Sequence, residues 1–500
     1  MEKLTELLNL RASVEMGGGK EKVEEQHKLG KKTARERIAA LIDEGTFVET
    51  NAFVSKKCSK YDMENAYADG VVTGYGAIDG RPVVVYSQDA TVLGGSIGEM
   101  HAQKIAKAIE NAVKTGVPVI GITDCSGVRL QEGLDALEGI GKILSNMSDA
   151  SGVVPMINVV AGKLAGIAAC MASMADFTFM VEKTSEMYLN GPQVIKGTSN
   201  TDLTLDELGG ANAHAKSGEA DFVCKDEDDM IAKVKNLLTY LPDNNLSETP
   251  AYNSSDDINR MEDTLNSVVS SGNYSVKTVV ENVCDLGSVV EIKAEYATNA
   301  STFIARLNGE TVGIVANSDE LDRKAIYKIE SFIKRMDSFN IPVVTFVDVA
   351  GFKACACEEN GGVLTACAKL VNAYASMTSP KITVAINRAC GGAYLVMGSK
   401  HIGCDAYLAW ADAEIGIMAA EGAANILCRD EIAKAEDPVK AREEMIRDYK
   451  ENVSSTFAAA KRGYVDDIIE PATTRPRLIC ALEIFSSKRE CKPSKKHSAI

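Results

Sequence analysis

The chain has 500 residues, of which 45% are hydrophobic, and it carries a formal net charge of −16 at pH 7. This length favours two or three domains with sizeable cores, and the lack of a basic surplus argues against a nucleic-acid partner. The first residues are charged, and no segment reaches the roughly 20 apolar residues of a membrane span, so we expect a cytoplasmic protein. Since no export signal is visible, we interpret the 13 cysteines as reduced, mostly buried thiols.

The first half of the chain predicts alternating strands, a helix and further strands. The strands are expected at 45–49, 70–74, 78–85, 117–124 and 155–160. Asp79-Gly80 is typical of a hairpin turn, and an amphipathic helix is expected to end at Gly116. The strand that follows this helix runs into an Asp-x-x-Gly turn at 124–127, and the last strand leads into a turn of small residues at 165–168.

The second half repeats this order. Its strands are expected at 287–291, 303–305, 307–313, 341–348 and 380–385. Asn308-Gly309 takes the place of the first hairpin turn, and a second amphipathic helix is expected to end near Asn340. An Asp-x-x-Gly turn at 348–351 and a small-residue turn at 390–393 follow in the same sequence.

The two halves are therefore predicted to be copies of one α/β unit. The Asp-x-x-Gly turns are separated by 348 − 124 = 224 residues, and the strands that follow are separated by 380 − 155 = 225. Strands that alternate with helices favour a βαβ architecture. We expect domains at 1–250 and 251–500, with the polar segment Leu241–Asn273 as the linker between them.

The small-residue turns are the sharpest candidates for chemistry. A turn of glycine and alanine that opens a helix presents backbone N–H groups at the positive end of the helix dipole, which suits a developing oxyanion. The alternative interpretation is that the small residues only allow tight packing of a helix on the sheet. The presence of such a turn at the same place in both halves favours the functional interpretation.

Other sequence features give no catalytic site. Cys355-Ala356-Cys357 could bind a metal or act in redox chemistry, but its spacing is not that of a zinc site, and we predict no metal. The chain has no HExxH, no GxSxG and no phosphate-binding lysine after Gly17-Gly18-Gly19. It also lacks Met-Lys-Met, so the chain itself is not expected to carry biotin.

Motifs along nearly the whole chain resemble those of the biotin-dependent acyl-CoA carboxyltransferases. This family includes the propionyl-CoA carboxylase β subunit and the methylmalonyl-CoA decarboxylase α subunit. The matching segments are 30–38, 70–76, 87–89, 94–96, 129–133, 191–192, 208–210, 391–394 and 422–426.

The resemblance implies a duplicated crotonase-like fold, that is, two ββα superhelix domains of the ClpP/crotonase type, in a homo-oligomer that is usually a hexamer. The N-terminal domain would bind acyl-CoA, and the C-terminal domain would receive carboxybiotin. Two oxyanion holes are implied, the first at the N–H groups of Gly166 and Ile167 and the second at those of Gly392 and Ala393. The same mapping gives the substrate-binding positions Gly127, Gly191, Pro192, Gly391, Tyr394 and Leu395.

Three segments depart from the family pattern, and one of them, after Ala316-Asn317, is shorter than in the family. The family usually has Pro-Cys-Ala-Gly-Gly at the first hole, whereas this chain has Lys-Leu-Ala-Gly-Ile at 163–167, so Ile167 replaces a glycine. The family's PGFLPG turn is replaced by Ala-Gly-Phe-Lys-Ala-Cys at 350–355.

The implied function is transfer of CO2 between biotin on a carrier protein and the α-carbon of a short acyl-CoA, such as propionyl-CoA or methylmalonyl-CoA. The implied partners are a biotin carboxyl carrier protein and either a biotin carboxylase or a membrane decarboxylase subunit. Two alternatives stay open at this point. One is a structural paralogue that has lost catalysis, and the other is a crotonase-type hydratase or isomerase, which would need a positioned pair of glutamates.

Overall fold

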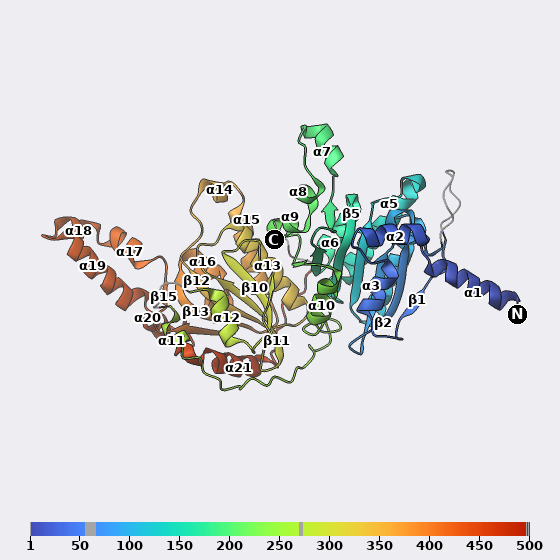
Figure 1. Ribbon diagram of the computed structural model, residues 1–500. Helices are drawn as coiled ribbons and strands as arrows, with labels where there is room; N and C mark the ends of the chain where they lie inside the picture. Colours follow the sequence, from blue (N-terminus) through green and yellow to red (C-terminus); the bar gives the residue numbers. More distant parts are fainter. Residues whose placement is uncertain (1, 56–66, 270–273, 497, 499) are drawn as a thin grey trace. The chain divides into compact units, whose positions relative to one another are not determined.

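The structure is a computed structural model that describes residues 2–55, 67–269, 274–496, 498 and 500 (Figure 1). The chain divides into two compact units, Met1–Glu248 and Thr249–Ile500. Within the described residues, no helix is both long enough and apolar enough to cross a bilayer.

The first unit is built on one eight-stranded sheet with strand order β1-β2-β3-β4-β5-β6-β8, and β7 pairs with β5 off this path. Its strands are β1 Val48–Thr50, β2 Val71–Ile78, β3 Arg81–Gln88, β4 Val119–Cys125, β5 Met156–Ala165, β6 Phe177–Val181, β7 Glu186–Tyr188 and β8 Phe222–Cys224. β1 to β3 pair antiparallel, and all pairings from β3 onward are parallel. Asp79 and Gly80, both at positive φ, form the expected hairpin turn between β2 and β3.

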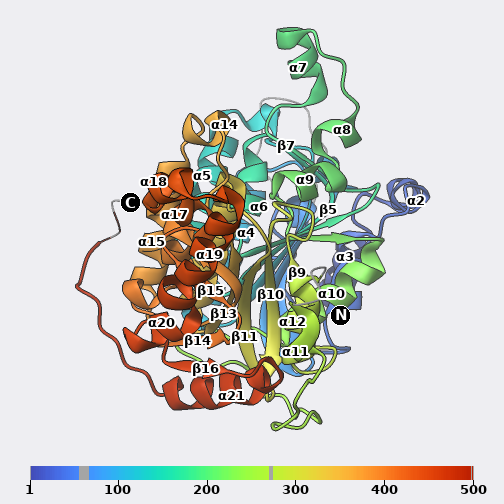
Figure 2. The same cartoon turned by 90° about the vertical axis from the view of Figure 1, so that its left-hand side faces the viewer.

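Ten α-helices of the first unit lie among the described residues, and most of them pack on this sheet. They are α1 Glu2–Glu15, α2 Lys20–Lys28, α3 Ala34–Leu41, α4 Glu99–Thr115, α5 Leu134–Ala150, α6 Cys170–Met174, α7 Pro192–Ser199, α8 Leu205–Gly209, α9 Ala211–Ser217 and α10 Glu227–Leu238. α4 ends at Gly116, whose left-handed conformation (φ 66°) favours glycine, as the sequence predicts. α4 and α5 bury their apolar faces in one core with β3, β4 and β5. α7 buries no residue and stands away from the sheet of its own unit in both views (Figures 1 and 2).

The second unit repeats the first strand by strand. Its strands are β9 Val290–Ile292, β10 Ala300–Leu307, β11 Glu310–Asn317, β12 Val343–Val349, β13 Lys381–Cys390, β14 Ala406–Trp410, β15 Glu414–Gly416 and β16 Asp467–Ile469. From β9 the order is β9-β10-β11-β12-β13-β14-β16, and β15 pairs with β13 just as β7 pairs with β5. The first three strands are again antiparallel and the others parallel, so the predicted duplication is confirmed.

The helices of the second unit add an arm that the first unit lacks. They are α11 Leu265–Val268, α12 Val276–Val283, α13 Arg323–Ser338, α14 Ala356–Glu359, α15 Val363–Ser376, α16 Gly391–Val396, α17 Ala420–Leu427, α18 Arg429–Lys434, α19 Pro438–Tyr449, α20 Thr456–Lys461 and α21 Thr474–Phe485. α17 and α18 pack against α19 (Figure 2). These three helices form what we call the arm, and they bury few of their apolar side chains within the chain.

The linker is shorter than predicted. No helix or strand occurs from Leu241 to Thr264, as expected of a connecting segment. α11 follows, and its Leu265 is 1% exposed in the core of the second unit, so this part of the expected linker belongs to that unit. Residues 270–273 of the expected linker lie outside the described residues.

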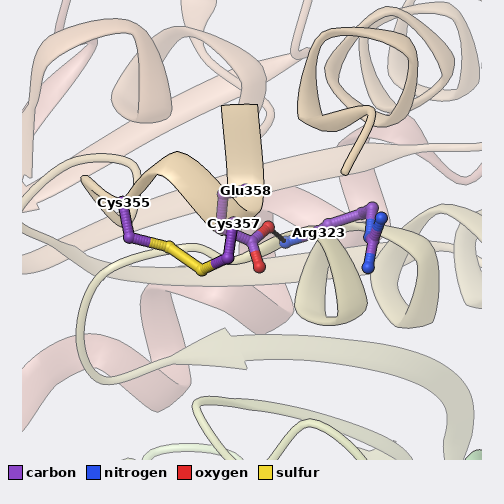
Figure 3. The surroundings of a disulfide bond; sticks show 4 residues. All are labelled: Arg323, Cys355, Cys357 and Glu358. Atoms are coloured by element: carbon purple, nitrogen blue, oxygen red, sulfur yellow. Dashed lines mark hydrogen bonds between the residues drawn. A yellow bond between two sulfur atoms is a disulfide. The ribbon is translucent and has the colours of Figure 1, made fainter. Parts of the chain in front are cut away.

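The prediction that all cysteines are reduced is wrong for one pair. Cys355 and Cys357 form a disulfide, with their Cα atoms 5.3 Å apart (Figure 3). Cys355 has an extended backbone (φ −147°, ψ 151°) and caps α14, while Cys357 lies in the first turn of that helix. The change from extended to helical backbone brings the two side chains together within the Cα separation that a disulfide needs. Ten other cysteines are free thiols, and Cys58 lies outside the described residues.

Candidate active-site turns

The two small-residue turns have the same backbone conformation. Ala165 (φ −111°, ψ 148°) ends β5, and Cys390 (φ −114°, ψ 143°) ends β13. The next residues, Gly166 and Gly391, both have φ 70°. This left-handed conformation favours glycine, because a side chain would clash with the neighbouring backbone. Each glycine then opens a short helix, the 3-10 turn Gly166–Ala169 that leads into α6 in the first unit, and α16 in the second.

The match of the glycines sets the register between the two turns. Since Gly166 corresponds to Gly391, Ile167 corresponds to Gly392, and Ala168 corresponds to Ala393. The pairs named from the sequence, Gly166 with Ile167 and Gly392 with Ala393, are therefore one residue out of step. The separation of 391 − 166 = 225 residues, which the strands already follow, is the signal that identifies Ala168.

Gly166 and Gly391 are the first residues of their short helices, so the backbone N–H groups of each turn lie at the N-terminal end of a helix. The first N–H groups of a helix have no acceptor within the helix and lie at its positive end. Ala168 and Ala393 are fully buried, so their N–H groups are held by packed backbone. Ile167 is 39% exposed, which places its side chain at the surface of the first unit beside the turn. This geometry can stabilise an oxyanion.

A second loop lies against each turn. In the first unit a Cβ on Gly127 (φ 108°) would lie 3.2 Å from the carbonyl oxygen of Ala165, so glycine allows the close approach. In the second unit a Cβ on Gly392 would lie 3.1 Å from Cε2 of Phe352. Phe352, the third residue after β12, thus lies beside the second turn and limits the space there.

A buried aspartate fixes the strand that leads into the first turn. Asp124, at the end of β4, accepts hydrogen bonds from Lys31 Nζ (2.9 Å), Arg37 Nη1 (3.2 Å) and the Lys163 N–H of β5 (3.2 Å). Burial by itself raises the pKa of the Asp124 carboxyl, but Arg37 and Lys31 hold this pKa below its ordinary value of 3.8. The carboxylate is therefore charged, and it ties β5 to the N-terminal segment just before Gly166.

Asp348, near the end of β12, likewise fixes the strand that leads into the second turn, but its partners are different. It accepts hydrogen bonds from the Tyr274 hydroxyl (2.5 Å), Arg388 Nε (3.0 Å) and Asn387 Nδ2 (3.3 Å). Burial of Arg388 lowers its pKa, but Asp348 more than offsets this and raises it. Sequence reasoning named neither aspartate as a site residue, although both begin the Asp-x-x-Gly turns that revealed the duplication.

The remaining predicted positions lie around these turns within their own units. Ala165 pairs with Tyr188, and a Cβ on Gly191 would lie 3.4 Å from the Tyr188 ring, so Gly191 and Pro192, at the start of α7, lie close to the strand that pairs with the end of β5. Tyr394, on α16, is 8% exposed, and its hydroxyl lies 3.2 Å from His401 Nε2, so its side chain is buried beneath the helix that carries it. The side chain of Leu395, in contrast, is 39% exposed. Among the described residues no group of His, Cys, Asp and Glu is arranged to hold a metal ion.

Comparison with known proteins gives matches over the whole chain. The family model of the carboxyl transferase domain matches residues 25–500. The carboxyltransferase subunit of propionyl-CoA carboxylase from Haloferax mediterranei is 43% identical over 100% of this chain and 99% of its own. The α subunit of methylmalonyl-CoA decarboxylase from Veillonella parvula is 44% identical over the same shares. A solved structure of transcarboxylase 12S, described as a hexamer with methylmalonyl-coenzyme A and methylmalonic acid bound, has a TM-score of 0.95 at 43% identity and covers 99% of this chain and 97% of that one.

Proposed function

Because the chain belongs to the carboxyl transferase family of biotin-dependent acyl-CoA carboxyltransferases, we propose that it moves CO2 between biotin on a separate carrier protein and the α-carbon of a short acyl-CoA. The matches to the family model and to transcarboxylase 12S confirm three predictions made from the sequence. These are the family, the carboxyltransferase activity and the duplicated crotonase-like fold. The acyl group that we propose is propionyl or methylmalonyl, the groups named for the relatives. The exposed, apolar Leu395 on α16 is compatible with such an apolar acyl portion.

The observation that carries the proposal is the pair of equivalent turns. Transfer of CO2 to or from the carbon next to a thioester places negative charge on the thioester oxygen. Loss of CO2 from carboxybiotin likewise places negative charge on the urea oxygen of biotin, so the reaction needs two charge-stabilising sites. Two turns with the same left-handed glycine and the same helix start supply two such sites. No catalytic side-chain base is required of this chain, because loss of CO2 leaves the basic centre on the substrates themselves.

The turn at Gly391 fits biotin, and the turn at Gly166 fits the thioester. Biotin, when bound, supplies the nitrogen that carries CO2 and the urea oxygen that gains charge as CO2 leaves. Gly392 has no side chain to obstruct a ring system, and the N–H groups of Gly392 and Ala393 would hold the urea oxygen. In the first unit the N–H groups of the turn Gly166–Ala168 would hold the thioester oxygen, and Ile167 would narrow the approach to it.

The other roles follow from the same proposal. Residues 1–250 bind acyl-CoA and residues 251–500 receive carboxybiotin. The partners are a biotin carboxyl carrier protein and either a biotin carboxylase or a membrane decarboxylase subunit. The protein acts in the cytoplasm as a homo-oligomer, most simply a hexamer like that described for transcarboxylase 12S.

The variant Ala393→Pro tests the second turn. Proline removes one N–H donor outright, and its φ is tolerated in the first turn of a helix. We expect transfer from carboxybiotin to fall by about 10²–10³, equivalent to roughly 3–4 kcal/mol. Ala393→Gly keeps the N–H group and is the matched control. Acyl-CoA affinity should be unchanged in both variants, and wild-type transfer by Ala393→Pro would refute the assignment of this turn.

A further inference from the structure

The loop that follows the Asp-x-x-Gly turn is anchored differently in the two units. In the first unit Arg129 is 2% exposed and forms ion pairs through Nη1 with Asp69 (2.7 Å) and Glu132 (2.7 Å). Its Nε also donates to Ser96 Oγ (3.2 Å). A buried, doubly paired arginine fixes this loop without any covalent link.

The second unit keeps one part of this anchor and has lost the other. Glu132 Oε2 accepts the N–H of Glu99, the first residue of α4 (2.6 Å), and Glu358 Oε2 accepts the N–H of Arg323, the first residue of α13 (2.7 Å). The two glutamates therefore have the same role, since 323 − 99 = 224. The residue equivalent to Arg129 is 129 + 224 = 353, and Lys353 is exposed.

The disulfide lies where the arginine anchor is missing. From Arg129 to Glu132 the chain advances 132 − 129 = 3 residues, whereas from Lys353 to Glu358 it advances 358 − 353 = 5. The two additional residues fall in the segment that holds the disulfide between Cys355 and Cys357 (Figure 3). A covalent bond thus constrains the longer loop, between Lys353 and the glutamate that holds α13.

This loop is continuous with the segment that lies beside the second turn. The Lys353 N–H donates to the carbonyl oxygen of Leu321 (2.9 Å), and the Cys355 N–H donates to the carbonyl oxygen of Lys353 (3.1 Å). Phe352, one residue before Lys353, lies against Gly392. Cys355 therefore lies only two residues after Lys353, whose hydrogen bond to Leu321 fixes the backbone next to Phe352. A change at the disulfide can in this way reach the aromatic ring beside the Gly391–Ala393 turn.

We propose that Cys355 and Cys357 form a reversible thiol–disulfide exchange site for low-molecular-weight thiols, and that the oxidised form holds Phe352 in place beside Gly392. The effect on catalysis rests on the proposed role of the Gly391–Ala393 turn in binding biotin. A loop that is already ordered binds a ligand more tightly than a loop that must become ordered on binding, because no conformational entropy is lost at that step. The oxidised protein is therefore the form with higher affinity for biotin.

The exchange needs only a thiol and its disulfide. A thiolate attacks the exposed Sγ of Cys357, the Cys355–Cys357 bond breaks, and the half-buried Cys355 leaves as a thiolate and takes up a proton. A second thiolate attacks the resulting mixed disulfide, which releases Cys357 as a thiol and forms the external disulfide. Two external thiols are oxidised for each protein disulfide that is reduced, and the reverse reaction restores the bond.

The first experiment measures the exchange itself in the full-length protein. The protein is equilibrated with buffers of increasing ratio of reduced to oxidised glutathione, alkylated under native conditions and analysed by peptide mass spectrometry. We expect the 355–357 peptide to change from unalkylated to doubly alkylated across the series, while Cys480, an exposed free thiol, is alkylated throughout. A pair that stays oxidised until the protein unfolds, or reduced at every ratio, would overturn the proposal.

The second experiment measures the coupling to the turn. We expect the oxidised protein to bind biotin about fivefold more tightly than the reduced protein. Saturating biotin should then lower the midpoint potential of the pair by about 20 mV, since tenfold corresponds to 29.6 mV for two electrons. The double variant Cys355→Ser, Cys357→Ser should bind like the reduced form whatever the buffer, and Cys480→Ser should behave like wild type.

The outcomes separate this inference from the proposed function. Equal biotin affinity of the oxidised and reduced proteins overturns the coupling, even if Ala393→Pro abolishes transfer. If biotin does not bind in either state and Ala393→Pro retains transfer, the proposed function of the turn has failed, whereas the glutathione titration still decides whether the pair exchanges.

Discussion

Ile167 and Gly392 occupy the same backbone position in the two units and differ in the space they leave beside the turn. A β-branched side chain that is 39% exposed stands in the first unit, and a hydrogen atom stands in the second. The units therefore offer a narrowed and an open approach to otherwise equivalent N–H groups. In the proposed function, the narrowed approach would give the first turn a preference for a particular acyl group.

We expect Ile167→Gly to raise kcat/KM for acyl-CoAs with larger acyl groups by about tenfold relative to propionyl-CoA, the scale of removing a hydrocarbon contact from a pocket. The measurement is the rate of carboxyl transfer across a series of acyl-CoAs. Ile195→Gly, on α7, is the control for the general effect of adding glycine. An unchanged acyl preference would show that Ile167 does not face the pocket.

Asp124 should carry a large, pH-dependent part of the stability of the first unit. Arg37 is fully buried, so Asp124→Asn leaves its charge with Glu227 alone, and we expect a loss of about 3–5 kcal/mol at pH 7. The folded pKa of Asp124 is lowered, so its contribution is present above pH 3.8 and is lost as the pH falls through the folded pKa. Urea unfolding should therefore show the gap between wild type and variant closing below about pH 4.

The control is the exposed ion pair between Lys32 and Asp228, which lies next in sequence to Glu227, the other partner of Arg37. Asp228 is 79% exposed and pairs with Lys32, so Asp228→Asn should cost less than about 1 kcal/mol. If both variants cost the same, the burial of Arg37 does not determine the stability.

At the scale of elements, α4 and α13 each carry a buried lysine in the same place, since 328 − 104 = 224. Lys104 donates to the carbonyl oxygen of Ala68 (2.9 Å), and Lys328 donates to those of Tyr296 and Ala300 (both 2.7 Å). Burial lowers the pKa of each amine from 10.5 to about 8. Each helix is thus fixed by a buried lysine amine to backbone carbonyl groups at or just before the start of an antiparallel strand, β2 in the first unit and β10 in the second. The positive charge of each amine is costly to bury.

This placement predicts an unusual dependence of stability on pH. Between about pH 8 and 10.5 the unfolded chain binds more protons at Lys328 than the folded chain, so this residue favours folding increasingly as the pH rises. Lys328→Met should therefore lose about 1–3 kcal/mol relative to wild type between pH 7.5 and 10. Chemical unfolding at both pH values tests this, and Lys324→Met, at an exposed position of the same helix, should show no such change.

The elements also show what the sequence could and could not predict. The hairpins, the buried strands and the two small-residue turns were predictable, because Asp-Gly, Asn-Gly and alternating apolar residues act locally and appear twice at one separation. The disulfide was not, because a Cys-x-Cys spacing permits a bond only where an extended residue meets a helix start. The partners of Asp124 were also hidden, since Lys31 and Arg37 lie about 90 residues away in the sequence and reach this carboxylate only in the folded protein. The domain roles and the site assignments stay predictions.

For the whole molecule, we expect a dimer-based homo-oligomer, most simply a hexamer, at micromolar concentration in light scattering. The arm exposes Ile426, Leu427 and Val439, each by at least 65%, and a contact between subunits would remove these apolar side chains from water. Leu427→Asp should shift the distribution toward smaller species. Leu246→Asp, at a 91% exposed linker position, is the matched control. A clean monomer with full transfer activity would contradict the expectation.

Gly162 and Asn387 occupy equivalent places, since 387 − 162 = 225, and they make the two halves non-interchangeable at this position. In the first half the Asp124 carboxylate fills the space, and a Cβ on Gly162 would lie only 2.0 Å from Oδ1. In the second half the Asn387 amide donates to Asp348. Recombination that copied one repeat onto the other would drive an asparagine side chain into Asp124, or would remove a donor from Asp348. Copying of one repeat onto the other would therefore destabilise the protein at this position, which disfavours such an exchange between the two halves of the gene.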